Sequence, residues 1–592
     1  MSKESKFPNA YEIRKLTFKY ALQNAVLHEG KAELKAVISK VIAEKPEVRS
    51  IIRNVIPLIK EIIEEVNRKP LAEQKRILQE RYPELLEKRV VKEEKKLPPL
   101  PNVEKYGKVV TRFAPNPDFV LHLGNARPAI LSYEYARMYK GKFILRFDDT
   151  DPKIKKPMPE AYDLIKDDLK WLGIRWDGEY VQSRRLEIFY DYATKLIKLG
   201  GAYVDTCDSN TFRKYRDNMK PCPHRNQSIE DALELWDKML EGYFGEGEAV
   251  LRIRTDLNHP DPSVRDWVAF RIIDTNKNPH PLVGSKYIVW PTYNFASAID
   301  DYLLGITHIL RAKEHMTNTV KQKYLYSYFG WRYPETIHFG RLKLKGFILS
   351  KSMIKSKIEK GEFEGVDDPR LGTLAALRRR GFSAEAIRAL ILDVGIKPSE
   401  ATISMENLAA INRKIIDVKA PRILFVDNPV KVIVEGISGY ESEIPFHPEN
   451  KKLGSRKIVL KGINNKVVVY ISEKDSKKLV PGKFLRLLEL FNIEVISVPK
   501  RRNEPITAKY AGPSLEEARK RKAPIIQWVP ADRNVKVIVR KPSGNQLVNI
   551  EGLAEEAIKM FNVNMVFQFY RFGFVRIDSV KGGVYITYFA HE

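Results

Sequence analysis

A predicted strand, two prolines and a predicted helix start follow one another within residues 108–140, and this stretch limits what the chain can fold into. The apolar residues at its beginning predict a strand that ends at Pro115 and Pro117, and apolar residues at helical spacing begin near Gly124. A helix N-terminus presents unpaired N–H groups, and a glycine there lets a bulky ligand approach the backbone. With His122 as a further hydrogen-bond donor, the junction is suited to a phosphate group. An ordinary strand-to-helix junction with a solvated histidine is the alternative at this point.

Composition indicates a large protein with a polyanionic partner. The 592 residues predict three to five domains, and 43% hydrophobic residues suffice for sizeable cores. Lys and Arg exceed Asp and Glu by 102 − 75 = 27, an excess that favours nucleic acid as the partner. Only Cys207 and Cys222 occur, which excludes a disulfide framework and favours a reducing compartment. Because the first six residues lack an apolar core and no run of about 18 apolar residues exists, we expect a cytoplasmic protein without membrane contact.

The pattern along the chain predicts several domains in order. Residues 1–86 read as a helical N-terminal appendage, and the charge-dense, proline-rich residues 87–105 read as a linker. Residues 106–352 alternate strands with helices, which is typical of an α/β domain with a parallel sheet, and residues from about 200 to 290 read as an insertion. Residues 353–418 predict a helical connector. From residue 419 the pattern is all-β, suited to barrels or sandwiches.

Two further features bear on the chemistry. A buried-type strand, Phe143–Phe147, ends at Asp148, and carboxylates at this end of a sheet strand lie where such folds bind ligands. Much later, Lys351 stands between Ser350 and Ser352, and a flexible lysine between hydroxyls can neutralise charge on a phosphoryl group. By itself the tripeptide reads more readily as a basic surface loop. No Gly-Lys pair is followed by Ser or Thr, which excludes P-loop chemistry.

Taken together, these stretches resemble the class I aminoacyl-tRNA synthetases, and specifically the archaeal form of the glutamyl-tRNA synthetase family. His122-Leu123-Gly124-Asn125 is similar to the HIGH signature of that class, and Ile348–Ser352 is similar to its KMSKS signature. The β-rich region that begins at Ala420 resembles the family's anticodon-binding barrels. The resemblance implies a multidomain α/β fold: a Rossmann-type parallel-sheet core with an inserted acceptor-binding domain, the helical appendage and connector, and C-terminal all-β anticodon-binding barrels.

The implied reaction is the ATP-dependent activation of L-glutamate to glutamyl-adenylate, followed by transfer to the 3′-terminal adenosine of tRNA(Glu), with Mg²⁺ accompanying ATP. His122 and Lys351 would be catalytic. The resemblance assigns ATP binding to His122, Gly124, Asn125, Ser350, Lys351 and Ser352, and glutamate binding to Arg112, Ala114, Asn116, Asp148, Tyr293 and Arg311. Asn125 stands where many members have a second His, and Ile348 replaces the first Lys of KMSKS, so the roles of these flanking positions stay open.

Specificity rests on Arg311. A carboxylate side chain in a pocket favours a guanidinium partner, for which Arg112 and Arg311 are the candidates. Arg311 occupies a place that is not an arginine in glutaminyl-tRNA synthetases, and an arginine facing neutral glutamine would be left unpaired. We therefore expect a glutamate–tRNA ligase, with the glutaminyl enzyme and a catalytically idle tRNA-binding scaffold as alternatives. We expect a monomer, and charging of tRNA(Gln) stays open.

A metal site and an RNA surface are the remaining predictions. Asp205, Cys207, Cys222 and His224 lie where some relatives carry a Cys-x-Cys…Cys-x-His zinc site. Because Asp205 replaces the first Cys, a metal-free loop is favoured over bound Zn²⁺. The clusters Arg378–Arg380 and Lys500–Arg502 are suited to RNA phosphates. For the near-alternating aromatic residues we favour a barrel core over base stacking; they are Phe567, Phe569, Tyr570, Phe572 and Phe574.

Overall fold

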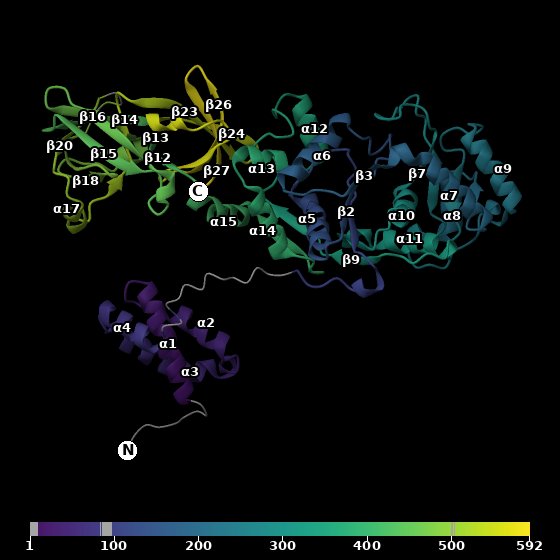
Figure 1. Cartoon of the computed structure of the whole chain (residues 1–592), viewed down its shortest axis with the longest axis horizontal. Helices are drawn as coiled ribbons and strands as arrows, with labels where there is room; N and C mark the ends of the chain where they lie inside the picture. The colour runs from purple at the N-terminus through teal and green to yellow at the C-terminus, as the bar shows by residue number, and fades with distance from the viewer. Residues whose placement is uncertain (1–9, 83–84, 86–96, 499–500, 502–503) are drawn as a thin grey trace. The chain divides into compact units, whose positions relative to one another are not determined.

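The computed structural model of the chain describes residues 10–82, 85, 97–498, 501 and 504–592, and divides into two compact units at residues 96 and 97 (Figure 1). The described part of the first unit contains four α-helices: α1 (Ala10–Leu27), α2 (Leu34–Glu44), α3 (Val48–Asn67) and α4 (Leu71–Arg81). The apolar positions that recur at helical spacing, such as Leu22 and Ile59, form its fully buried core. The predicted helical appendage is confirmed. The predicted linker lies outside the described residues except for residues 97–105.

The second unit begins with the α/β domain that the resemblance predicts to be the catalytic domain, and its parallel sheet positions the candidate site. Its strands β1 (Val110–Phe113), β2 (Lys142–Phe147) and β3 (Gly178–Val181) pair in that order, all parallel. The parallel pair β8 (His308–Ala312) and β9 (Glu335–Phe339) lies beside β1, where the Thr307 N–H donates to the Val110 carbonyl over 2.9 Å. The carboxyl ends of β1, β2 and β8 therefore meet at one edge, as the sequence pattern predicts.

Helices bury this sheet, which explains why β2 is almost continuously apolar. Helix α5 (Leu123–Met138) packs on β1, β2 and β8 through buried residues such as Ala126, Ile130 and Tyr135. Arg146 is the polar exception in the buried part of β2. The other helices of the domain are α6 (Pro159–Trp171), α7 (Leu186–Lys198), α10 (Tyr293–Leu303) and α11 (Met316–Tyr328).

The insertion is a separate antiparallel sheet with its own core. Its four strands pair in sequence order: β4 (Ala202–Asp205), β5 (Val250–Ile253), β6 (Val268–Ile272) and β7 (Val289–Pro291). Helices α8 (Ser209–Asp217) and α9 (Ile229–Leu240) accompany them, and Trp236 of α9 is fully buried against the sheet. Antiparallel pairing distinguishes this segment from the parallel core on either side.

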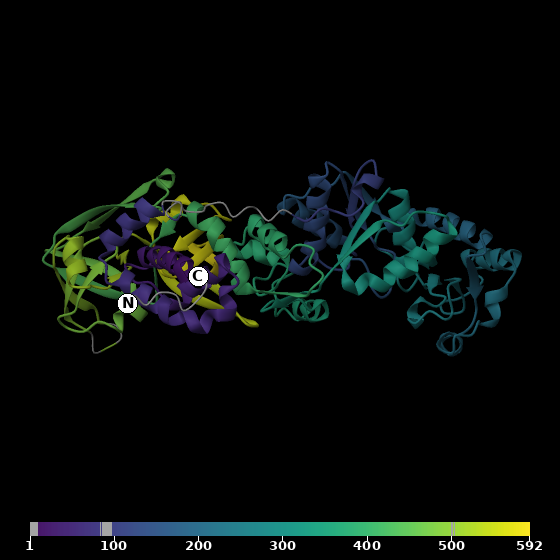
Figure 2. The same cartoon turned by 90° about the horizontal axis from the view of Figure 1, so that it is seen from below.

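A connector links the catalytic domain to the C-terminal sheets, and both views show its helices between them (Figures 1 and 2). It follows α12 (Lys351–Glu359) and comprises α13 (Leu374–Arg380), α14 (Ala384–Val394) and α15 (Met405–Ile416). Strand β11 (Ala401–Ser404) of the connector pairs in parallel with β10 (Leu342–Lys345) of the catalytic domain. The connector is therefore joined to the catalytic domain by backbone pairing as well as by packing.

The C-terminal region consists of two seven-stranded sheets and a hairpin. The first sheet has the order β12 (Arg422–Ile423), β25 (Val566–Phe569), β26 (Gly573–Lys581), β27 (Val584–His591), β23 (Asn534–Ser543), β24 (Gln546–Glu555) and β13 (Phe425–Asp427). The second has the order β21 (Ile525–Ile526), β18 (Phe484–Leu487), β19 (Asn492–Ser497), β20 (Ile506–Tyr510), β14 (Pro429–Glu435), β17 (Lys466–Ser472) and β22 (Val529–Pro530). The hairpin pairs β15 (Gly439–Pro445) with β16 (Ser455–Lys461).

The aromatic prediction in this region is confirmed for the residues that point inward. Phe567, Phe569 and Phe574 are fully buried, while Tyr570 and Phe572 are partly buried. The near-alternation of these aromatic residues therefore marks the core of the C-terminal β-sheet region, as predicted from the sequence.

Two members of the basic cluster Arg378–Arg380 are not free for RNA phosphates, so the prediction is wrong for Arg379 and Arg380. Arg380 is buried and donates to the carbonyls of Phe589 and Ala590, and Arg379 pairs with Asp578. These arginines instead attach the connector to the first C-terminal sheet. Of the second cluster, Lys500 and Arg502 lie outside the described residues.

Within the described ranges, no helix is long and apolar enough to cross a membrane.

Candidate active site

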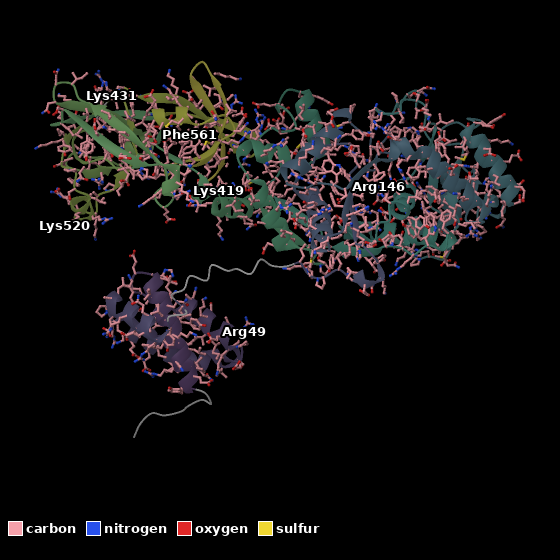
Figure 3. The ribbon with its side chains drawn as sticks, viewed as in Figure 1. Arg49, Arg146, Lys419, Lys431, Lys520 and Phe561 are labelled. Carbon is pink, nitrogen blue, oxygen red and sulfur yellow. The ribbon has the colours of Figure 1, made fainter. Side chains whose placement is uncertain are left out.

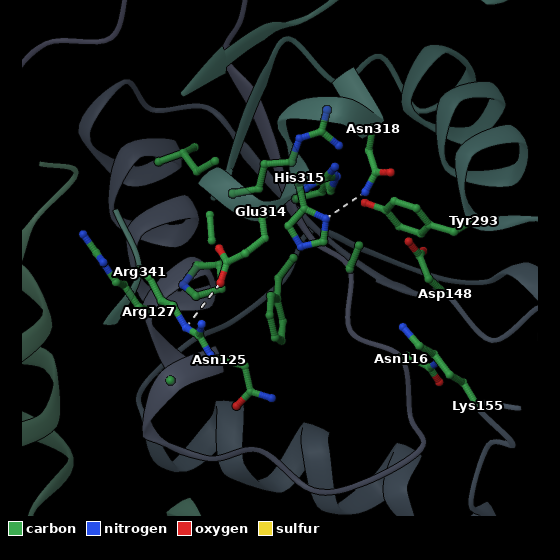
Figure 4. Close-up of a pocket in the computed structure, with 18 of the residues that line it drawn as sticks. Asn116, Asn125, Arg127, Asp148, Lys155, Tyr293, Glu314, His315, Asn318 and Arg341 are labelled. Carbon is green, nitrogen blue, oxygen red and sulfur yellow. Dashed lines mark hydrogen bonds and ion pairs between the residues drawn. The ribbon is translucent and has the colours of Figure 1, made fainter. Parts of the chain in front are cut away.

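A cavity of about 1240 Å³, the central cavity, opens at the carboxyl ends of β1, β2 and β8 and at the N-terminus of α5 (Figure 4). Nine of the residues predicted from the sequence line it: Arg112, Ala114, Asn116, His122, Gly124, Asn125, Asp148, Tyr293 and Arg311. Segments almost 200 residues apart therefore converge on one pocket, large enough for more than one small substrate.

His122 caps α5 with its side chain. Its Nδ1 accepts a hydrogen bond from the Gly124 N–H over 2.9 Å, and its own backbone N–H donates to Asn125 Oδ1 over 2.6 Å, which completes a capping box. Because Nδ1 accepts, the proton of the neutral ring is on Nε2. Burial lowers the pKa of His122 below its ordinary value, so the ring is a neutral donor near pH 7.

Gly124 is required by the position of that ring. A Cβ atom at residue 124 would lie 2.7 Å from His122 Cε1 and 2.9 Å from its Nδ1. Any larger residue would force the imidazole to move. The glycine therefore serves the histidine as well as the approach of a ligand to the helix N-terminus.

Four buried charged side chains form a chain of ion pairs beneath the cavity. Arg112 Nε and Nη2 lie 3.1 and 3.3 Å from the two carboxylate oxygens of Asp301. Arg146 Nη1 lies 2.7 Å from Asp301 Oδ1, and its Nε lies 2.6 Å from Asp148 Oδ1. The two ends of this chain, Arg112 and Asp148, line the cavity, and Figure 3 shows Arg146 inside the catalytic domain. This series of ion pairs fixes the cation Arg112 and the anion Asp148 in the cavity wall.

The carboxyl group of Asp148 remains sensitive to pH. Burial raises its pKa to about 6, against the opposing effect of the Arg146 guanidinium. Above that value it is an anion that can hold an ammonium group.

Arg311 is a buried and incompletely paired charge in the cavity wall. It is 5% exposed, and its Nη2 reaches Thr319 Oγ1, Gln322 Oε1 and the Tyr333 hydroxyl at 2.5, 3.1 and 2.9 Å. Its Nε and Nη1 are buried without a hydrogen-bond partner among the described residues, and no carboxylate pairs with it there. Leaving buried donors without hydrogen bonds costs free energy, so the site is suited to a ligand carboxylate that would accept from them.

The Ser350–Ser352 segment does not line the cavity. Lys351 is the first residue of α12, and its ammonium pairs with the Asp118 carboxylate. Ser350 and Ser352 lie beside each other at 3.5 Å between hydroxyl oxygens, and only their neighbour Leu349 reaches the wall. The predicted partnership of His122 and Lys351 is therefore not made in this conformation.

Several lining residues were missed from the sequence. His315, Asn318, Arg341 and Lys343 all face the cavity, and Glu314 pairs with Arg341 at 3.7 Å. A usable signal existed for two of them: Glu314 and His315 stand two and three residues after the end of β8, much as Asp148 stands at the end of β2.

The predicted metal ligands cluster in the insertion. The ligand atoms of Asp205, Cys207, Cys222 and His224 all lie within 4.8 Å of one another. Asp205 Oδ1 lies 3.0 Å from His224 Nδ1, while Asp205 Oδ2 accepts from Arg252 Nε over 2.6 Å. Two thiols, an imidazole and a carboxylate at these separations fit a tetrahedral zinc ion.

Comparison with known proteins agrees with this architecture. A family model described as the catalytic domain of class I (E and Q) tRNA synthetases matches residues 108–418. Two models of anticodon-binding domains from the same group match residues 420–511 and 525–578.

Relatives match along nearly the whole chain. A glutamate–tRNA ligase from Hyperthermus butylicus is 56% identical over 566 residues, covering 94% of this chain and 97% of the relative. Those from Pyrococcus furiosus and Thermococcus kodakarensis are 53% and 54% identical over 584 and 583 residues, covering 98% of this chain and all of each relative.

Proposed function

Because the chain belongs to the class I synthetases for glutamate and glutamine, and within them to the archaeal glutamate–tRNA ligases, we propose that it activates L-glutamate with ATP and transfers it to tRNA(Glu). Enzymes of this family use ATP and Mg²⁺, and the matching anticodon-binding domains imply a tRNA partner. The carboxylate of glutamate attacks the α-phosphate of ATP and releases pyrophosphate. The acyl group then passes to the terminal ribose of the tRNA.

Arg311 carries the choice of amino acid. Its Nε and Nη1 are buried in the cavity wall without partners among the described residues, and the side-chain carboxylate of glutamate would accept a hydrogen bond from one of them and pair with the guanidinium charge. Glutamine would offer these donors one neutral oxygen and bring an amide N–H group against a buried cation. This observation favours glutamate over glutamine and argues against the glutaminyl enzyme.

The remaining groups at that end of the cavity hold the rest of the amino acid. The ionised Asp148 binds the ammonium group, while Tyr293, Ala114 and Asn116 shape the wall, and Asn116 Oδ1 is a buried acceptor without a partner among the described residues. Asp301 engages Nε and Nη2 of Arg112, and the Nη1 group, which has no partner among the described residues, would serve the substrate.

The N-terminus of α5 binds ATP. His122 Nε2–H donates to a phosphate oxygen, Gly124 leaves the helix N-terminus open, and Asn125 holds the His122 backbone through the capping box. Lys351, with Ser350 and Ser352, acts after its ammonium exchanges Asp118 for phosphate oxygens. Intact His122 and Lys351 argue against a catalytically idle scaffold.

The cysteine cluster has the right donor set for zinc, which would act structurally there. Cys207, Cys222 and His224 are preferred ligands, and the contact of Asp205 with Arg252 leaves one carboxylate oxygen for a metal. The metal content of the purified protein decides between Zn²⁺ and the metal-free loop that the aspartate favours.

The wider assignments are part of the same proposal: a cytoplasmic monomer, residues 200–290 on the acceptor stem and residues 419–592 on the anticodon. Charging of tRNA(Gln) as well is decided by assaying both purified tRNA species.

ATP–pyrophosphate exchange with glutamate and tRNA(Glu) tests the central proposal. We expect exchange that depends on glutamate, and little with glutamine. Exchange that prefers glutamine would overturn the proposed specificity for glutamate. Absence of exchange with either amino acid would overturn the proposal that the chain is an active enzyme.

A further inference from the structure

His315 lines the central cavity without a role in the binding scheme above. It ends a short 3₁₀ turn, η6 (Lys313–His315), directly between β8 and α11. Its ring lies near that of Tyr293, with 6.1 Å between centroids and 47° between planes. The side chain is thus held on the amino-acid side of the cavity.

The hydrogen bond to Asn318 fixes the tautomer of His315. Asn318 Nδ2 lies 3.0 Å from His315 Nδ1, and Figure 4 shows this contact on one side of the ring. An amide nitrogen only donates, so Nδ1 accepts and the proton of the neutral ring is on Nε2. The nitrogen that carries the proton is the one that Asn318 does not use.

The surroundings keep the ring neutral. Burial and the nearby cations Arg311, Arg112 and Lys155 together lower the pKa of His315 to about 4, with Glu314 opposing them. These groups come from β8, β1, the loop after β2 and η6 itself, and Tyr293 faces the ring from α10. His315 is therefore a neutral donor near pH 7.

Resting on the proposed function, we propose that His315 is a further catalytic residue, whose Nε2–H donates a hydrogen bond to the α-carboxyl oxygen of glutamate that becomes the acyl carbonyl oxygen. The other two arms of glutamate already have partners, Asp148 for the ammonium and Arg311 for the side chain. The α-carboxyl group of a glutamate held by these two partners would lie between them, and the ring of His315 lines the same cavity beside Tyr293.

The role follows from the charge that develops during transfer. The ribose hydroxyl adds to the acyl carbon, and the carbonyl electron pair moves onto the oxygen that His315 contacts. Collapse breaks the bond from carbon to the phosphate oxygen, AMP leaves with that electron pair, and the hydroxyl proton passes to it. His315 keeps its proton throughout and stabilises the oxyanion as a preorganised neutral donor.

Two substitutions test the proposal. His315→Phe removes the donor and keeps a ring, and His315→Gln keeps a donor. We expect kcat for aminoacylation to fall about 100-fold or more in His315→Phe, with the KM for glutamate changed less than about threefold, and His315→Gln to retain activity within about tenfold. Lys313→Gln, an exposed neighbour in η6 outside the cavity wall, is the control and is expected to match the parent enzyme.

The outcomes separate this inference from the proposed function. A parent enzyme that does not ligate glutamate overturns the function, whereas an active parent matched by His315→Phe overturns the role of His315. Should His315→Phe fail to fold by circular dichroism, His315→Gln decides, and a loss of 100-fold or more there overturns the inference. The acid limb of kcat should coincide in parent and His315→Gln; its disappearance in the variant would mean that His315 titrates and is not a neutral donor.

Discussion

Arg146 Nη1 and Asp301 Oδ1 lie 2.7 Å apart, with neither side chain more than 1% exposed. This ion pair joins the two ends of the site, because Asp301 also holds Arg112 and Arg146 also holds Asp148. The two charges Arg146 and Asp301, which do not line the cavity, therefore hold in place the two that do, Arg112 and Asp148.

Replacing Arg146 with Met should disable glutamate binding and destabilise the fold. Asp148 and Asp301 would lose a shared buried partner, and removing one member of a buried ion pair costs about 3–5 kcal/mol. We expect a large drop in unfolding free energy in urea and a raised KM for glutamate. Arg137→Met removes a solvent-exposed pair with Asp177 and should cost less than about 1 kcal/mol. Equal losses in both variants would contradict the role assigned to Arg146.

The pH dependence of kcat/KM for glutamate should report on Asp148. Its pKa is raised to about 6, so the anion that holds the ammonium group is lost as pH falls through that value. We expect kcat/KM to decline tenfold per pH unit below about pH 6 and to be flat above it. Asp148→Asn should be poorly active at every pH, without that limb. If the acid limb of the pH profile persists in Asp148→Asn, it arises from the titration of another group, and the assignment to Asp148 is wrong.

Arg311→Ala should lower kcat/KM for glutamate by about two orders of magnitude or more, since each tenfold corresponds to about 1.4 kcal/mol of lost transition-state binding. Arg332→Ala is a matched control, because Arg332 is half exposed and pairs with Glu335 at 3.4 Å outside the cavity wall. Kinetics like those of the parent in Arg311→Ala would refute the pocket assignment.

Gly124→Ala should lower kcat through His122. The new Cβ would lie 2.7 Å from the ring, so the imidazole must leave its cap position on α5. We expect at least a tenfold loss in ATP–pyrophosphate exchange, in line with a displaced catalytic group. Gly107→Ala, where no atom lies within 4 Å of the new Cβ, should be silent. Full exchange activity in Gly124→Ala would show that the ring position is not critical.

The site residues that could be predicted from the sequence are those whose positions depend on residues next to them in the chain. His122, Gly124 and Asn125 act together because they are consecutive at one helix start, and Asp148 follows directly on its strand. Ion pairs between residues far apart in the chain could not be predicted in this way. Nothing in the sequence says that Asp301 bridges Arg112 and Arg146, since the three residues meet only when α10 packs against the sheet. The connector arginines were misread for the same reason, because burial of Arg380 depends on a strand about 210 residues later.

Asp168→Asn should stabilise the protein at alkaline pH. Asp168 in α6 is 2% exposed, its Oδ2 has no hydrogen-bond partner among the described residues, and burial raises its pKa to about 7. Below the ordinary pKa of an aspartate both the folded and unfolded states are protonated, so the residue costs nothing there. As pH rises towards 7 the unfolded state loses its proton first, and stability falls until the folded state also ionises.

At about 1.4 kcal/mol per pKa unit, the parent should be several kcal/mol less stable at pH 8 than the asparagine variant, and the gap should close towards pH 4. Urea unfolding across this range measures it. Asp167→Asn, whose side chain is 59% exposed, is the control and should leave the pH dependence unchanged. A constant difference between Asp168→Asn and the parent at all pH values would show that the gain comes from packing rather than from the buried charge.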